Sequence, residues 1–327
     1  MATAGSFTFN KATMIALMKK IWDDYSIVLV TIGIVLIASI FNPRILTLNT
    51  MLSIWRSASI VGIIALGMTF VIIAGGIDLS AGHIVAASGG ALIMLLRNPE
   101  MPLFVAILAC VLVAVAIGLF TGTIITKANL PPFIVTLAIG ILFRSITMHF
   151  LGGATVTVGR PVPEFIRIGL GTTFGVLPNA FVAFIIMTII ASFILNYTKF
   201  GSYVYAAGGN ENAARYSGIN VNLVRTGTYV LLGLCIGITT VFDLSRMAAV
   251  AANTSGLQYE FDAITAVVIG GTSLMGGKGR ILGTVMGVFI IGMVNHLMVM
   301  MNISPFLVGA VKGTIILVAV LLQKQDN

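Results

Sequence analysis

The sequence predicts an all-α polytopic membrane protein with about ten transmembrane helices. Hydrophobic residues make up 58% of the 327 residues and charged residues only 9%, whereas soluble proteins are about half apolar and about a quarter charged. Mean hydropathy is +1.09. Apolar runs recur along the whole chain, and no long hydrophilic block separates them. We therefore expect one integral membrane domain rather than several soluble ones.

The spans can be placed because a bilayer-length helix needs about 20 mostly apolar residues. The first run follows a basic segment like that of a signal peptide, but Asp23 and Asp24 interrupt that segment and no cleavage site follows, so we expect a retained helix. The predicted organisation is a cytoplasmic segment 1–25, a transmembrane domain 26–322 and a cytoplasmic tail 323–327. The predicted spans are residues 26–41, 57–74, 81–96, 101–126, 131–151, 174–195, 226–242, 261–275, 281–300 and 305–322.

The loop charges predict the orientation. With the N-terminus in the cytoplasm, ten spans return the C-terminus to the same side, and that side then carries more Lys and Arg than the other. The longest cytoplasmic segment is then 196–225 and the longest external one is 152–173. The net charge of +8 is spread over short loops rather than gathered on one face, which argues against nucleic acid as a partner.

Two glycine-rich stretches occupy matching positions in the two halves of the chain. "VIIAGGIDLSAG" covers residues 71–82 and "VVIGGTSLMGG" covers residues 267–277. Matching interruptions of short hydrophobic segments indicate an internal repeat with broken helices beside a transport path. Glycine pairs are also common where membrane helices pack tightly, so both interpretations stay open.

The residues that could support catalysis do not form a catalytic group. His83, His149 and His296 lie far apart in different apolar runs, and Cys110 and Cys235 also lie inside apolar runs. Residues 270–280 are rich in glycine but lack the spacing of a phosphate-binding loop, since Gly279 stands where Ser or Thr is required. The sequence thus predicts no catalytic residue, no metal site and no nucleotide site.

A few polar residues lie inside the predicted spans. A charge at the centre of a membrane helix costs roughly 2.5–3.5 kcal/mol on insertion scales, so such residues suggest function. We expect Arg144 and Lys312 to pair with opposite charges as structural contacts. Asp78 could contact a solute, or it could cap the helix that starts near Ala81 together with Ser80.

The cytoplasmic segment contains the polar stretch "YAAGGNENAARYSGINV", residues 205–221. Gly208 and Gly209 interrupt what precedes, Asn210 is a favourable N-cap, and residues 211–217 can form a short helix before Gly218 ends it. Such a helix could be a plain connector or a handle for a soluble partner. The residues alone leave both open.

Several motifs together resemble a known family. "GGIDLSAG", "TLAIGILFRSI", "YAAGGNENAARYSGINV", "DAITAVVIGGTSLMGGKGRILGTVMG" and "ISPFLVGAVKGTIILVAVLL" resemble, in order and spacing, the permease subunits of ribose-type ABC importers. That family imports ribose, xylose, galactose, related sugars and autoinducer-2. In this chain His83 and His296 stand where the family usually has Ser and Asn, which leaves the identity of the solute open.

The resemblance implies a permease of the bacterial cytoplasmic (inner) membrane, surrounded by lipid and paired with a second copy or a paralogue. A soluble binding protein would deliver the solute outside, and a cytoplasmic ABC ATPase would bind ATP and Mg, so that this chain needs no cofactor. The family docks a short cytoplasmic helix into the ATPase. The implied docking residues are Gly208, Gly209, Asn210, Glu211, Ala213, Ala214, Arg215, Ser217, Gly218 and Ile219.

The function expected from these features is inward transport of a small polar solute, most simply a monosaccharide such as ribose. Asp78, Ser80, Thr136, Asn253 and Asn295 are the expected contacts along its path. Autoinducer-2 or a branched-chain amino acid is the alternative solute. An ion-coupled carrier or a passive channel is the alternative class, although neither accounts for the polar helix at 210–217.

Overall fold

The computed structural model describes residues 32–33, 35–36, 39–40 and 43–323. The segment 1–25, most of the predicted span 26–41 and residues 324–327 of the tail lie outside the described residues. After the short helix η1 (Pro43–Leu46), the elements in chain order are α2 (Leu48–Ile73), α3 (Ala81–Leu96), α4 (Leu103–Ala128), α5 (Pro132–Phe150), β1 (Thr155–Thr157), α6 (Pro163–Leu170), β2 (Thr172–Thr173), β3 (Leu177–Pro178), α7 (Asn179–Tyr197), α8 (Lys199–Gly209), α9 (Glu211–Tyr216), α10 (Val221–Ser245), β4 (Ala249–Ala251), α11 (Tyr259–Ile269), α12 (Ile281–Met300) and α13 (Pro305–Gln323).

Helices long and apolar enough to cross a membrane dominate the described part of the chain. Six meet both conditions: α2, α4, α5, α7, α10 and α12. The chain is therefore a helical membrane protein that crosses the bilayer several times, as the sequence predicts. The number of ten spans and their direction remain predictions.

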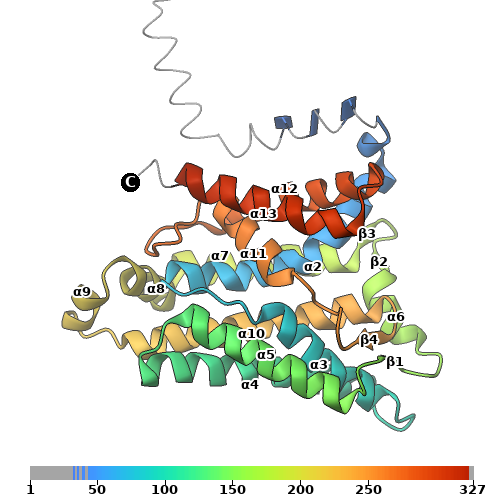
Figure 1. The fold of residues 1–327 in the computed structure, drawn as a ribbon, viewed down its shortest axis with the longest axis horizontal. Helices are drawn as coiled ribbons and strands as arrows, with labels where there is room; N and C mark the ends of the chain where they lie inside the picture. Colours follow the sequence, from blue (N-terminus) through green and yellow to red (C-terminus); the bar gives the residue numbers. More distant parts are fainter. Residues whose placement is uncertain (1–31, 34, 37–38, 41–42, 324–327) are drawn as a thin grey trace, which may run out of the picture.

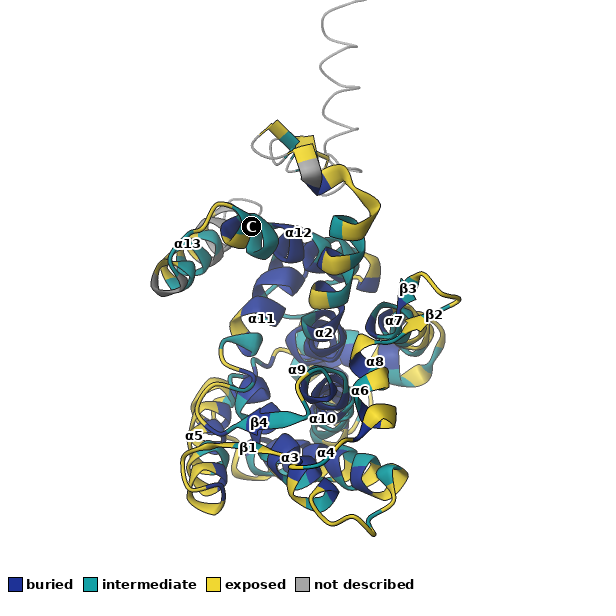
Figure 2. Cartoon of the chain, turned by 90° about the vertical axis from the view of Figure 1, so that its right-hand side faces the viewer, coloured by how far each residue is buried: buried dark blue, intermediate teal, exposed yellow. Residues whose placement is uncertain are grey.

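The helices divide into a buried centre and an apolar rim (Figure 2). α2 lies in the middle of the described fold and most of its length is buried, whereas α4, α5 and α7 expose large apolar side chains on their outer faces. In water such faces would drive aggregation, but in a bilayer they meet lipid chains as apolar as themselves. The rim helices are thus suited to contact lipid.

Small residues bring α4 and α10 into close contact. An added Cβ at Gly118 would overlap the backbone carbonyl of Tyr229, and one at Gly122 would lie 2.9 Å from the Cα of Thr226. The Thr126 and Thr226 hydroxyls lie 3.1 Å apart and share a hydrogen bond. Glycine and threonine allow backbones to approach in lipid, where no hydrophobic effect pushes helices together. Tight packing therefore accounts for part of the glycine content.

Both predicted helix interruptions are present. α2 ends at Ile73, and the chain turns at Gly75, which has φ +82°, before α3 begins. α11 ends at Ile269, where Gly271 has φ +84°, so the predicted span 261–275 is wrong in its second half. The 16 residues of α3 and the 11 of α11 rise about 24 Å and about 17 Å at 1.5 Å per residue, less than the ~30 Å of a bilayer core.

The connecting segments gather at two opposite ends of the helices (Figure 1). α8 and α9 lie at one end, together with the break after α2 and the loop between α11 and α12. α6 and the two small antiparallel sheets, β1 with β4 and β2 with β3, lie at the other end.

The predicted start of α2 at residue 57 is too late. The helix begins at Leu48, because the hydroxyl of Thr47 accepts a hydrogen bond from the backbone of Thr50 and caps a longer helix.

Candidate functional site

Three glycine-containing segments meet at the end of the fold that carries α8 and α9. We call this contact the glycine junction: residues 73–76 after α2, Gly208 and Gly209 at the end of α8, and residues 276–279 before α12. The Gly277 amide donates a hydrogen bond of 2.9 Å to the Ile73 carbonyl. An added Cβ at Gly208 would overlap that same carbonyl. Backbone therefore packs directly on backbone here, with no side chain between.

Side chains reinforce the glycine junction. The Tyr205 hydroxyl, on α8, donates to the Gly279 carbonyl at 2.7 Å. The Arg225 guanidinium, near the start of α10, donates to the Ala74 carbonyl at 3.2 Å and pairs with Glu211 of α9 at 2.8 Å. Short, direct contacts thus connect α8 and α9 to α2 and to the α11–α12 loop.

Two arginines surround the Glu211 carboxylate. Arg215, one turn later on α9, lies 2.8 Å from Oε1, and Arg225 lies 2.8 Å from Oε2. Partial burial alone would raise the pKa of Glu211, but the hydrogen bonds and charges of Arg215 and Arg225 outweigh it and lower the pKa below its ordinary value of 4.5. Glu211 is therefore ionised at neutral pH and fastens α9 to α10.

The remaining implied docking residues form one short helix and its ends. The Asn210 side chain accepts from the Ala213 amide at 2.9 Å, which is an N-cap, and Gly218 has φ +80° where the helix terminates. Ala214 faces inward and is buried, and Ile219 packs against the core. Ala213, Arg215, Ser217 and Gly218 are exposed, and Tyr216 between them is 92% exposed.

Three of the five residues named for the solute path lie together at the turn before α3, and the other two lie elsewhere. Asp78 is buried and accepts two 2.6 Å hydrogen bonds from the amide and the hydroxyl of Ser80, which organises the turn before α3. Thr136 on α5 accepts from the Leu79 amide at 3.1 Å in the same turn. Asn253 is exposed after β4. Asn295 lies elsewhere, on α12, beside a cavity.

Arg144 and Lys312 make different contacts. Arg144 donates to the Ala252 carbonyl at 2.9 Å and the Ser255 carbonyl at 3.1 Å, and so holds the loop after β4 against α5. Lys312 on α13 pairs with Asp262 of α11 at 2.8 Å, with 16% and 7% of their side chains exposed. Arg144 thus binds carbonyls rather than a carboxylate.

The sequence interpretation missed two buried carboxylates, Glu260 and Asp262. Glu260 accepts from the Gly82 amide at 3.2 Å, and Asp262 accepts from Lys312. Glu260 lies just before the predicted span 261–275 and Asp262 is its second residue, so both resemble the polar flank of a span. The sequence does contain a signal for these contacts. Glu260 and Asp262 stand at the start of one apolar run, and Lys312 lies inside another, where it needs an opposite charge.

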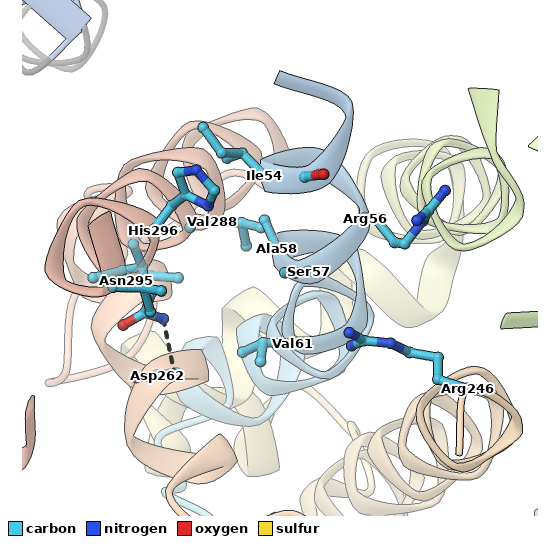
Figure 3. Close-up of a pocket in the computed structure, with 15 residues that line it drawn as sticks. Ile54, Arg56, Ser57, Ala58, Val61, Arg246, Asp262, Val288, Asn295 and His296 are labelled. Carbon is cyan, nitrogen blue, oxygen red and sulfur yellow. Dashed lines mark hydrogen bonds between the residues drawn. The ribbon is translucent and has the colours of Figure 1, made fainter. Parts of the chain in front are cut away.

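A cavity of about 410 Å³ opens beside α2, between α10, α11 and α12 (Figure 3). It lies at the end of α12 away from the glycine junction. Polar groups at its wall include Asp262, Asn295, His296 and Arg246, and its apolar lining includes Val61 and Val288. Asn295 and His296 come from α12, while Arg246 reaches toward Val61 from α10 (Figure 3).

A bundle of bilayer-length helices, an amphipathic segment fastened to two helix breaks at one end and a polar cavity toward the other together define a membrane transport protein. Residues 50–320 match the family described as "Branched-chain amino acid transport system / permease component". The match covers most of the chain, and the protein belongs to this family of transport permeases.

Curated relatives match about nine tenths of the chain. The ribose import permease of Haemophilus influenzae is 39% identical over 290 residues, which cover 88% of this chain and 89% of the relative. The ribose import permease of Bacillus subtilis is 40% identical, covering 90% of each. The D-allose transport permease of Escherichia coli is 33% identical, covering 93% and 92%. No solved structure matches the chain.

Proposed function

We propose that this chain is the membrane-spanning permease subunit of an ABC importer that carries a monosaccharide into the cytoplasm. The observation that carries the proposal is the set of relatives: permeases named for ribose, D-allose and L-arabinose each match about nine tenths of the chain. The family description mentions branched-chain amino acids, which keeps that solute as the second candidate.

The proposal includes an orientation. The glycine junction and α8–α9 face the cytoplasm, because that side then carries ten of the sixteen Lys and Arg outside Arg144 and Lys312, against six on the other side. The ten are Lys11, Lys19, Lys20, Lys127, Lys199, Arg215, Arg225, Lys278, Arg280 and Lys324. With the N-terminus also inside, ten spans place the C-terminus there too. The organisation is then a cytoplasmic segment 1–25, a transmembrane domain 26–322 and a short tail, in the inner membrane of a bacterium.

In the proposed mechanism a cytoplasmic ABC ATPase, which binds ATP and Mg, engages the exposed side of α9. This chain binds no cofactor of its own. ATP-driven movement of the ATPase displaces α8–α9, and the glycine junction passes the displacement to α2 and to the α11–α12 loop. The ATP energy shifts the equilibrium between outward-open and inward-open states because the ATPase binds the two states unequally. A second permease copy or a paralogue and an external solute-binding protein complete the assembly.

Transport by the purified assembly tests the proposal. The permease would be reconstituted into liposomes with its ATPase and binding protein, and uptake of labelled D-ribose measured. We expect uptake only when both partners and ATP are present. Uptake by the permease alone, driven by an ion gradient, would show an ion-coupled carrier instead. ATP-driven uptake of leucine but not of ribose, D-allose or L-arabinose would show the branched-chain amino-acid alternative.

A further inference from the structure

The cavity beside α2 contains polar groups that are only partly used by the protein. Arg246 is half-buried, and among the described residues its guanidinium makes no hydrogen bond or ion pair, although Asp243 lies close enough to offset its charge. The His296 ring likewise has no hydrogen-bond partner there. Asn295 makes one long contact, 3.4 Å to Asp262. Unused donors beside a cavity require a partner, since an unpaired half-buried polar group is unfavourable.

The part of the cavity wall formed by Asp262 is held in a fixed position. The Lys312 ammonium lies 2.8 Å from Asp262 Oδ2, and the Asn295 amide contacts the same oxygen. The pair joins α13 to α11, and Asn295 adds α12, so three helices fix the position of the Asp262 carboxylate. A fixed carboxylate, an amide and a guanidinium are groups that hydrogen-bond the hydroxyls of a polyol, while Val61 and Val288 offer apolar surface for its C–H faces.

The size of the cavity restricts the ligand. About 410 Å³ lies toward the lower end of the range of small-molecule sites, roughly 300–1,000 Å³. A monosaccharide fits within this volume and leaves room for water. Lys312 pairs with Asp262, whereas Arg246 and Arg56 line the cavity without an ion pair to any described residue. The free hydrogen-bond donors of Arg246 suit the hydroxyl oxygens of a sugar.

Arg56 also borders the cavity, but its side chain projects away from Asn295 (Figure 3). Its Nε is buried and has no hydrogen-bond partner among the described residues, so Arg56 adds a further free donor at the border of the cavity.

We propose that this cavity is a solute-holding site for a monosaccharide within a single permease chain, with Arg246, Asn295, His296 and Asp262 as its hydrogen-bonding residues. The proposal rests on the proposed function and deepens it. The site lies in the half of the bundle opposite the glycine junction, where solute enters from outside. Asp78, Ser80 and Thr136 take no part in it, because their polar atoms bind one another and the turn before α3.

Substitutions in the cavity test this assignment in the reconstituted assembly with D-ribose as the probe. Arg246→Met keeps the length of the side chain but removes its donors, and Asn295→Leu removes the amide at similar size. Each lost hydrogen bond to the sugar should lower uptake at limiting ribose about 3- to 10-fold. Val61→Trp fills the cavity and should abolish uptake. Binding-protein docking and ATP hydrolysis without sugar should stay at the wild-type level in all three.

Matched controls separate the site from general damage. Arg97→Met removes an exposed arginine at the same end of the bundle, and Leu112→Trp adds the same bulk on the outer face of α4. Both should transport ribose as the wild type does. Normal uptake by Val61→Trp and Arg246→Met would overturn the site. If the unmodified assembly imports no sugar, the proposed function itself fails and the site fails with it.

Discussion

At the scale of single residues, Gly208 is the described glycine at which the fold leaves least room for a side chain. It sits in α8 with helical backbone geometry, so an alanine would be acceptable there but for the Ile73 carbonyl that its Cβ would overlap. Gly209 is adjacent in the same helix, and its Cβ would meet nothing closer than the Gly277 Cα at 3.9 Å. Alanine substitutions at Gly208 and Gly209 therefore form a matched pair, in which only the first disturbs the backbone contact.

We predict that Gly208→Ala lowers the free energy of unfolding by about 1–3 kcal/mol, the usual effect of overpacking, and strongly reduces ATP-driven uptake. Gly209→Ala should change stability by less than about 1 kcal/mol. Thermal unfolding in detergent and uptake into liposomes measure the two effects. Equal behaviour of the two variants would show that the close backbone contact has no mechanical role.

The sequence reveals part of this residue-scale picture. It predicts the Asn210 cap and the Gly218 stop, because both depend on neighbours within a few positions. It does not predict that Ile73, Gly208 and Gly277 touch, since that contact joins residues 69, 135 and 204 positions apart and depends on how α2, α8 and the α11–α12 loop pack. Glu260 and Asp262 escaped detection for a related reason: α11 is a half-length helix, so its acidic first turn lies inside the bundle.

At the scale of elements, the attachment of α9 to the bundle depends on Glu211. Its pKa is lower in the folded protein than its ordinary value of 4.5, owing to Arg215 and Arg225. A carboxylate whose pKa falls on folding stabilises the folded state above its unfolded pKa, and the contribution is lost as the pH falls through the folded value.

The expected result is a pH-dependent difference between the wild type and Glu211→Gln. The wild type should unfold at a higher temperature near pH 7, and the difference should shrink as the pH falls below about 4. Glu164→Gln, which changes a carboxylate on α6 at the other end of the bundle, provides the control and should show no comparable difference. A gap between the wild type and Glu211→Gln that persists at low pH would contradict the ion-pair account.

The bounds of the helices can be predicted from the sequence where a long apolar run determines them. The long apolar runs gave α4, α5 and α12 to within a few residues, because burial in lipid imposes about 20 apolar positions. The end of α11 was misplaced because residues 270–275 remain partly apolar while Gly270 and Gly271 end the helix. The small strands β1 and β4 depend on pairing between distant segments, which no local pattern reveals.

At the scale of the whole molecule, the polar cavity and the glycine junction lie toward opposite ends of one helical bundle. The cavity lies toward one end and the glycine junction at the other, and α2 runs between them. A push on α8–α9 can therefore alter the helices that border the cavity. The central claim is that α9 lies in the cytoplasm and bears on a separate ATPase.

Labelling of a single cysteine tests that claim most directly. Ala213→Cys introduces a thiol on the exposed face of α9, while the native Cys110 and Cys235 are buried. Phe174→Cys, at the exposed turn between β2 and β3, marks the opposite end. We predict that a membrane-impermeant maleimide reaches position 213 only from the cytoplasmic face and that bound ATPase protects it, whereas position 174 reacts only from outside. Labelling of position 213 from the external face, or equal labelling with and without the ATPase, would contradict the account.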